Sequence, residues 1–353
     1  MSTAPVVAPM SERDGEMRAL LKTDAGPGME LDTLPIPEPG TGEVRIRVES
    51  VGIDGGAEAL IYDWHESKRF YEPALPQLFG HEFAGTIDEV GTGVDRFGEG
   101  ERVAVEPFVG CGHCRYCRSG SPALCEERRL IGLDTELDGA LAEYAVVPQE
   151  TLYPIGDLDP DEGVFLELLG LAMLGVERSG FEPGDSVAIT GPGAVGIGAL
   201  VDVAAGGAGP ITVVGTEADR ERRLPLAEEL GATRTVTTEE GLDEEVDVFV
   251  EASGHPDALA LATEATRRGG EIVQIGIYHG HATVPADLNQ FVRKSLRFTP
   301  VYGRRDSSWR RALAVAERTD LSPAIGPSFP LSEYEKGFEA VRERRGVKVT
   351  LHP

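Results

Sequence analysis

The segment at residues 186–196 constrains the fold more than any other part of the chain. Its apolar run SVAIT leads directly into Gly191-Pro192-Gly193-Ala194-Val195-Gly196, and a run with helical character follows. The spacing G-x-G-x-x-G between a strand and a helix is typical of a dinucleotide site. Gly191 permits the tight turn, Gly193 the close approach of a pyrophosphate, and Gly196 the packing of helix on strand, while the helix N-terminus at Ala194 and Val195 faces the anion. The alternative is a glycine-rich turn that binds nothing.

Strand-like and helical segments alternate around this motif. Apolar runs at 186–190, 211–215, 246–252 and 271–277 are separated by helical patterns at 196–206, 221–232 and 256–269. Such alternation is typical of βαβ units in a parallel sheet. Residues 17–156 differ, because Gly and Pro interrupt short strand-like runs such as the alternating EVRIRVESVGI at 43–53. We therefore predict an α/β protein in which a mostly β domain accompanies a doubly wound parallel sheet.

The end of the strand at 211–215 decides which dinucleotide fits. An NAD site usually has Asp or Glu about 20 residues after the glycines, whereas Gly215 and Thr216 occupy that place here. A missing carboxylate leaves room for a 2′-phosphate. The candidate contacts for this phosphate are Thr216, Arg220, Arg222 and Arg223. The alternative is that the arginines only form a solvated helix face. Glu217 favours NAD instead, because it can hold a ribose hydroxyl or repel a phosphate. The prediction leans towards NADP, with NAD as the alternative.

The cysteines of the chain form one cluster with the spacing C-x2-C-x2-C-x7-C: Cys111, Cys114, Cys117 and Cys125. Four thiolates so spaced suit tetrahedral Zn²⁺, whereas two disulfides in such a short segment would need strained closure. Because protein would fill all four positions, this zinc would be structural. A zinc knuckle for nucleic acid is the other reading, which the neighbouring Glu126 and Glu127 disfavour.

A second group of possible metal ligands is scattered along the chain. His81 and Glu82 are adjacent, Asp54 follows a strand and precedes two glycines, and Glu167 lies in the apolar run VFLELLGLAML. A buried carboxylate in such a run needs a metal or a cation. Asp54, His81, Glu82 and Glu167 are therefore candidate catalytic residues and ligands of a catalytic zinc, with Glu82 either a direct ligand or a supporting one. The alternatives are a turn role for Asp54 and a salt bridge for Glu167.

The charge balance excludes some partners. With 33 Lys and Arg against 60 Asp and Glu, the formal charge is −27, which disfavours nucleic acid. No apolar run reaches the roughly 18 residues that a membrane span needs, and residues 1–16 resemble a flexible tail more than a signal peptide. We therefore expect a cytoplasmic protein. The acid-rich, Lys-poor composition also suggests a high-salt organism, because salt screens self-repulsion.

Three motifs in one order carry a family resemblance: GHE-x-x-G-x5-G-x-x-V from residue 80, the four-cysteine lobe, and G-x-G-x-x-G from residue 191. Together they resemble the zinc-dependent medium-chain alcohol dehydrogenases. The resemblance implies a GroES-like catalytic domain at 17–156 and 303–353, interrupted by a Rossmann domain at 157–302, and a homodimer or homotetramer. It also implies hydride transfer from a zinc-bound secondary alcohol to nicotinamide.

The segments 61–64, 166–172 and the region after 302 are similar to the L-threonine 3-dehydrogenase and polyol or butanediol dehydrogenase branches. They imply a hydroxy amino acid, polyol or sugar substrate. Asp54 replaces the family's usual Cys and resembles glucose dehydrogenases of halophilic archaea, which makes sugar oxidation the alternative.

Gly56 and Ala59 stand where the family has its proton relay, so water, Glu58 or His65 must substitute. A zinc-free reductase and a non-catalytic cofactor-binding protein of the same fold are the remaining rivals.

Overall fold

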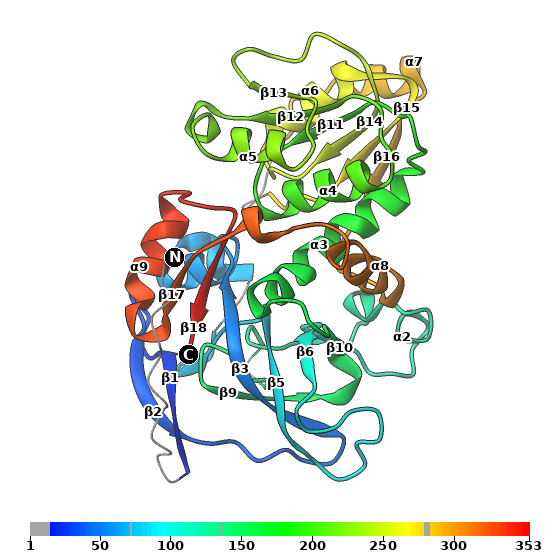
Figure 1. Cartoon of the computed structure of the whole chain (residues 1–353). Helices are drawn as coiled ribbons and strands as arrows, with labels where there is room; N and C mark the ends of the chain where they lie inside the picture. Colours follow the sequence, from blue (N-terminus) through cyan, green and yellow to red (C-terminus); the bar gives the residue numbers. More distant parts are fainter. Residues whose placement is uncertain (1–14, 71–72, 135, 279–282) are drawn as a thin grey trace, which may run out of the picture.

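The computed structural model describes residues 15–70, 73–134, 136–278 and 283–353. Residues 1–14 of the predicted tail lie outside these residues. Its last residue, Glu16, already begins the first strand, β1 (Glu16–Lys22). Figure 1 shows a β-rich unit below a unit built on a parallel sheet, with helix α3 (Pro160–Ser179) running between them. None of the helices in these parts of the chain combines the length and the apolar character that a membrane crossing requires.

The β-rich unit is built on one seven-stranded sheet. Strand β3 (Glu43–Ile53), predicted from its alternating pattern, is confirmed and lies at the centre. The order of the sheet is β10 (Leu152–Pro154), β6 (Arg102–Val105), β5 (Phe83–Val90), β3, β18 (Lys348–His352) and β17 (Ile325–Pro330), and β9 (Tyr144–Pro148) also pairs with β3. The end of the chain thus returns to the β-rich unit, where β18 pairs antiparallel with β3.

Smaller elements complete this unit. A three-stranded sheet has the order β2 (Glu30–Pro35), β1 and β4 (Gln77–Leu78), and the cysteine lobe lies between the paired strands β7 (Phe108–Val109) and β8 (Arg129–Leu130). The helices are α1 (Glu58–Tyr62), α2 (Arg115–Arg118) and α9 (Tyr334–Arg342). Short 3-10 helices occur at η1 (Glu66–Phe70), η2 (Pro122–Leu124), η3 (Gln149–Thr151), η5 (Ser322–Ala324) and η6 (Leu331–Glu333), whereas η4 (Glu217–Asp219) belongs to the second unit.

The second unit confirms the predicted parallel sheet. Its order is β13 (Arg234–Thr237), β12 (Ile211–Gly215), β11 (Val187–Thr190), β14 (Val246–Glu251), β15 (Thr266–Gln274) and β16 (Arg297–Pro300), with every pairing parallel. The helices of this unit are α4 (Ala194–Ala205), α5 (Arg223–Glu229), α6 (Pro256–Ala265) and α7 (Leu288–Lys294). The domain limits predicted at 156/157 and 302/303 stay a prediction.

The largest difference from the predicted elements lies where helix α6 meets strand β15. The helix expected over 256–269 ends at Ala265, and Thr266 already begins strand β15. The β-branched Thr266 pairs with Val246 on β14, and its hydroxyl donates to the carbonyl of Ala262, so the side chain closes the helix end. The Ala262 carbonyl thus accepts both the N–H and the hydroxyl of Thr266, and the helix ends there.

Helix α3 is the element that both units share. A capping box of Asp159 and Glu162 closes its start and Gly180, in the left-handed conformation, its end. It packs against β3 and β5 on one side and against α4 and α8 (Asp306–Ala316) on the other. The burial on both sides explains its near-continuous apolar sequence, and it places Glu167 between the units.

Candidate functional site

His81 is held by a carboxylate that the predicted ligand set leaves out. Nδ1 of His81 lies 2.6 Å from Oε1 of Glu58, and the backbone N–H of His81 donates to the same oxygen at 3.2 Å. Burial alone would lower the pKa of His81, but the Glu58 carboxylate outweighs it and raises that pKa. Burial would likewise raise the pKa of Glu58, and His81 lowers it instead. The pair orients the ring, so that Nε2 is left as its ligand atom.

Glu82 forms a buried ion pair with Lys348 of strand β18. Both side chains are almost fully buried, and burial lowers the pKa of Lys348 to about 8. Gly52 on β3 makes room for the pair, because a Cβ there would lie 2.5 Å from Cε of Lys348 and 2.6 Å from Oε2 of Glu82. Oε1 of Glu82 has no hydrogen-bond partner among the described residues.

Glu167 reaches the same place from helix α3. Its Oε1 lies 2.5 Å from Nη1 of the buried Arg304, whose other nitrogens donate to Glu106 at 3.0 Å. Burial raises the pKa of Glu167, although Arg304 opposes this shift. Oε2 of Glu167 is buried and, within the described chain, accepts no hydrogen bond. One oxygen of Glu167 is thus used for structure and the other is free.

These residues fit a divalent cation. His81, Glu82 and Glu167 each offer a ligand atom within 4.8 Å of the others, as do Asp54, Glu58 and His81. A buried oxygen without a partner costs about 1–3 kcal/mol, and a cation would satisfy both free carboxylate oxygens. One nitrogen and several oxygens form a donor set that zinc accepts. The structure brings the predicted ligands His81, Glu82 and Glu167 together, while Asp54 groups with His81 and Glu58. The assignment of all four to zinc stays a prediction.

The four cysteines also converge. Their ligand atoms lie within 4.8 Å of one another, and the Sγ atoms of Cys114 and Cys117 are 3.5 Å apart, too far for a disulfide of about 2.05 Å. A tetrahedron with Zn–S bonds of about 2.3 Å would separate sulfurs by about 3.8 Å. The backbone N–H of Cys117 lowers the pKa of Cys114 to about 7, which favours the thiolate. Gly110 permits this packing, since a Cβ would lie 2.5 Å from Sγ of Cys117.

The glycine-rich turn has the geometry that an anion needs. Gly191 has a φ of 86°, and Gly196 approaches so closely that a Cβ would lie 2.0 Å from the carbonyl oxygen of Gly191. Gly193 caps helix α4 without a side chain, and no atom lies within 4 Å of a Cβ built there. No side chain therefore caps the N–H groups at Ala194 and Val195, which begin the helix beside open space, as pyrophosphate binding requires.

At the end of β12, two of the predicted cofactor contacts, Glu217 and Arg220, bind each other, whereas Gly215 and Thr216 do not take part in that ion pair. Exposed Glu217 binds Arg220 at 2.8 Å, and Arg220 also binds Glu240 at 2.9 Å, so Arg220 is committed to carboxylates. Gly215 offers no carboxylate of the kind typical of NAD sites, and a Cβ there would lie 2.9 Å from Cδ2 of Leu224. Thr216 is exposed, and its hydroxyl donates to Asp219 at 2.7 Å.

The sequence patterns do not indicate the roles of three charged residues at these sites: Glu58, Arg304 and Lys348. Each contacts a partner far along the chain, such as Lys348 with Glu82, 266 residues apart. A charged residue in an otherwise apolar strand, such as Lys348 in VKVTL, is the signal in the sequence that could have indicated a buried ion pair.

Comparison with known proteins agrees with this architecture. Residues 40–157 match the alcohol dehydrogenase GroES-like domain, and residues 194–318 match the zinc-binding dehydrogenase family. The chain is 35% identical to an L-threonine 3-dehydrogenase of Bacillus subtilis, over 97% of this chain and 100% of that protein.

Solved structures are similar over nearly the full length. A zinc-binding dehydrogenase from Sinorhizobium meliloti bound to NADP has a TM-score of 0.85 and 28% identity, covering 96% of this chain and 99% of its own. The 2R,3R-butanediol dehydrogenase of Bacillus subtilis has a TM-score of 0.84 and 27% identity, with coverage of 96% and 99%.

Proposed function

The chain belongs to the zinc-dependent medium-chain alcohol dehydrogenase family, whose members act on CH–OH groups, and we propose that it oxidises a secondary alcohol with NADP as the preferred acceptor. The observation that carries the proposal is the buried cluster of His81, Glu82 and Glu167, in which two carboxylate oxygens lack hydrogen bonds among the described residues. The cluster lies where the β-rich unit meets α3, beside the unit that carries the glycine-rich turn.

The residues of the chain divide the work of this reaction. Asp54, His81, Glu82 and Glu167 would hold the zinc, which when bound acts as a Lewis acid that lowers the pKa of the alcohol. Glu58 fixes the orientation of His81, since its carboxylate accepts from Nδ1. The glycine-rich turn would hold and orient the dinucleotide, which when bound supplies the hydride acceptor.

The proton route differs from the family pattern. Gly56 and Ala59 offer no hydroxyl or imidazole. Glu58 is committed to His81, and His65 is exposed and accepts a hydrogen bond from the N–H of Ser67. Of the three candidate routes, water beside the half-buried Asp54 is therefore the one that we propose.

For the substrate we propose an L-threonine-like hydroxy amino acid, because L-threonine 3-dehydrogenases resemble the chain along 95–97% of its length. Polyols, butanediol and sugars are the alternatives. The test is reduction of NADP and NAD at high KCl with L-threonine against a panel of these alcohols. Turnover of threonine well above the panel supports the proposal. Turnover of sugars or polyols alone would instead identify Asp54 as the better guide to specificity.

Metal content separates the enzyme from its rivals. Two zinc ions per chain are expected, one at the cysteine lobe and one at the His81 cluster. Asp54 makes the second site richer in oxygen ligands and thus more open to exchange, so a chelator should abolish activity while the lobe zinc stays. One zinc per untreated chain would favour a zinc-free reductase or a non-catalytic cofactor-binding protein, and so would full activity after exhaustive chelation.

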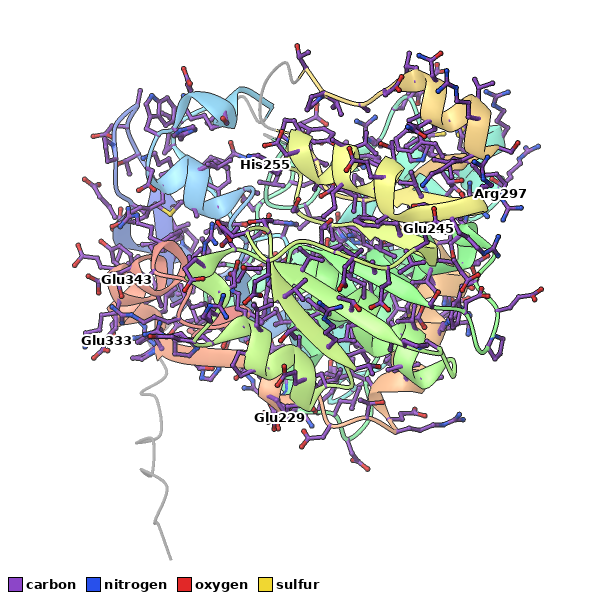
Figure 2. The ribbon with its side chains drawn as sticks, turned by 90° about the horizontal axis from the view of Figure 1, so that it is seen from above. Glu229, Glu245, His255, Arg297, Glu333 and Glu343 are labelled. Atoms are coloured by element: carbon purple, nitrogen blue, oxygen red, sulfur yellow. The ribbon has the colours of Figure 1, made fainter. Side chains whose placement is uncertain are left out.

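We also propose that the protein works in the cytoplasm of a halophilic archaeon. Acidic side chains such as Glu229, Glu333 and Glu343 lie at the periphery of the molecule (Figure 2), and the formal charge is −27. Salt screens their repulsion, so unfolding midpoints should rise across a KCl series. Midpoints that do not rise would contradict this proposal.

An edge of the parallel sheet supports an oligomer. On helix α7, Leu288 is 75% and Val292 79% exposed, and Phe298 of the edge strand β16 is also exposed. Apolar side chains so exposed at a sheet edge favour pairing with a second copy. We propose a homodimer or homotetramer formed partly through this edge. A monomer in light scattering at high KCl would contradict it.

A further inference from the structure

Arg344 joins the two units of the molecule at the end of strand β12. It lies between α9 and β18, both in the β-rich unit, with a φ of 52° in the left-handed region. Its Nη1 nevertheless lies 3.4 Å from Oγ1 of Thr216, which follows β12 in the other unit. The backbone therefore holds an uncommon conformation for a non-glycine residue, and the guanidinium lies at the strand end where a cofactor ribose binds in such folds.

Arg344 shares its nearby carboxylate with a second arginine. Asp219 is the nearby carboxylate, at 3.5 Å from Arg344 and 3.8 Å from Nη1 of Arg223. Its Oδ2 already accepts from the N–H and the hydroxyl of Thr216. One buried carboxylate thus serves two guanidinium groups, and this occurs in a chain with nearly twice as many acidic as basic residues. Arg344 therefore keeps donors that Asp219 does not use and that an anion could accept from.

Arg344 is also freer than the arginines that sequence inspection favoured. Arg220 is tied to Glu217 and Glu240, and Arg223 donates through Nε and Nη2 to the carbonyl of Gly346 at 3.1 and 2.9 Å. The Arg344 side chain stays 47% exposed, and its contacts to Thr216 and Asp219 are long. A guanidinium with weak existing bonds can turn its planar donors to a phosphate.

We propose that Arg344 binds the 2′-phosphate of NADP, with the hydroxyl of Thr216 turning from Asp219 to the same phosphate, so that this phosphate bridges the two units. The inference rests on the proposed function in one respect, namely that a dinucleotide binds at the glycine-rich turn. It adds that a residue of the returning C-terminal segment selects between NADP and NAD. Phosphate is the fitting ligand because a guanidinium forms paired, charge-assisted hydrogen bonds with it.

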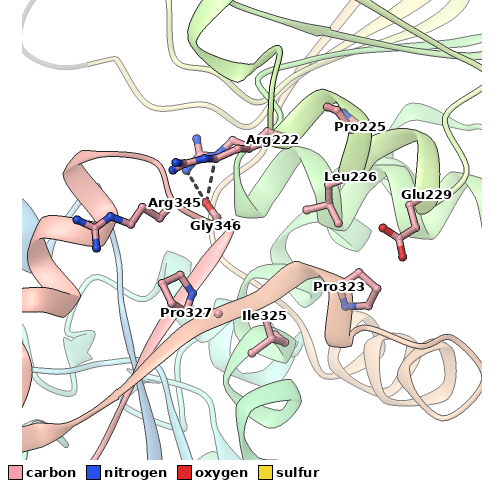
Figure 3. A pocket seen from close by; sticks show the side chains of 11 residues that line it. Arg222, Pro225, Leu226, Glu229, Pro323, Ile325, Pro327, Arg345 and Gly346 are labelled. Atoms are coloured by element: carbon pink, nitrogen blue, oxygen red, sulfur yellow. Dashed lines mark hydrogen bonds between the residues drawn. The ribbon is translucent and has the colours of Figure 1, made fainter.

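A neighbouring cavity offers the competing location for an anion. It has a volume of about 650 Å³ and lies between α5 and β17, with Arg222, Arg223 and Arg345 among its lining residues (Figure 3). Arg345, next to Arg344 in sequence, belongs to this cavity and pairs with Glu339 and Glu343. Arg344 does not line it. Arg345 is therefore a matched control for the position of the phosphate.

The test is calorimetric binding of adenosine 2′,5′-bisphosphate and of adenosine 5′-monophosphate to the full chain at one KCl concentration. We expect Arg344→Ala to weaken bisphosphate binding about 10–100-fold and to leave monophosphate binding unchanged, since a hydrogen bond to a charged group has that weight. Arg345→Ala should change neither. Thr216→Val should reproduce a smaller part of the loss, and unchanged melting temperatures confirm that the variants fold.

The outcomes separate this inference from the proposed function. Bisphosphate binding that survives Arg344→Ala would refute it, and so would a loss seen with Arg345→Ala alone, which would place the phosphate in the cavity. Equal affinity of the unmodified protein for both nucleotides would also refute it, with the dinucleotide site intact. Failure to bind either nucleotide would instead refute the dinucleotide site on which the proposed function depends.

Discussion

Replacing Gly52 by alanine should destabilise the protein strongly, although it adds only one methyl group. The new Cβ would lie 2.5 Å from Cε of Lys348, 2.6 Å from Oε2 of Glu82 and 2.8 Å from Cγ1 of Val164. These atoms belong to three different segments, so no single movement relieves all the contacts. The strand cannot shift either, because the N–H of Gly52 donates to the carbonyl of Glu82 at 2.7 Å and β18 pairs with it on its other side.

The magnitude follows from two costs. Inserting a methyl group into a close-packed interior costs about 1–3 kcal/mol. Forcing Lys348 away from Glu82 adds part of the roughly 3–5 kcal/mol that is lost when one partner of a buried ion pair is removed. We therefore expect a loss of about 3–5 kcal/mol in the free energy of unfolding, measured by urea titration at high KCl.

Gly55→Ala is the matched control. It lies three residues further along the same segment, and the nearest atom to its Cβ is Cγ1 of Val341 at 3.7 Å, an ordinary contact. Its free energy of unfolding should change by no more than about 0.5 kcal/mol. Equal stability of the two variants, with equal slopes in urea, would refute the reasoning, because it would mean that the buried pair tolerates an intruding Cβ.

Three further predictions concern the metal sites and the C-terminal strand. Glu58→Gln should weaken zinc at the His81 cluster about 10–100-fold in competition with a chelator and leave the lobe zinc in place, because only a carboxylate orients His81 fully; unchanged affinity would count against this role. Cys114→Ser should remove one zinc per chain and lower the melting temperature, whereas retention of both ions would exclude Cys114 as a ligand. Nε2 of His352 lies 2.8 Å from Oδ1 of Asp161, and this hydrogen bond raises the pKa of His352. Burial would raise the pKa of Asp161, but the hydrogen bonds that Asp161 accepts hold its pKa below the usual value. The pair therefore stabilises most between about pH 4 and 6.5 and loses its effect as pH rises through the raised pKa of His352. His352→Gln should then lower the melting temperature more at about pH 5.5 than at about pH 8.5, and an equal difference at both would contradict the assignment.

Local patterns predicted the elements whose cause is local. The turn from Gly191 to Gly196 follows from close backbone contacts within a few residues, and the cysteine lobe follows from a spacing that brings thiols together along one short segment. The parallel sheet followed from the alternation of apolar runs. The end of α6 was misjudged because the pairing of Thr266 with Val246 is a contact between distant segments.

The candidate metal cluster is a mixed case. Glu167 was selected because a carboxylate in an apolar run needs a cation, and Asp54, His81 and Glu82 because of their local positions. The structure brings His81, Glu82 and Glu167 together and groups Asp54 with His81. Their supporting partners were not found. Glu58 was considered only for a proton route, whereas it bonds to His81, and nothing near Glu167 in sequence indicates Arg304.

The fold class, the glycine-rich turn, the four-cysteine lobe and the acidic character could be predicted from the chain alone, because each rests on composition or on residues near one another in the chain. Which charges meet depends on how the chain folds back on itself. Lys348 reaches Glu82 because β18 pairs with β3, and Arg344 reaches Thr216 because the chain returns from one unit to the other. A pattern along the sequence carries no record of such pairings, since strand register and packing between units set them.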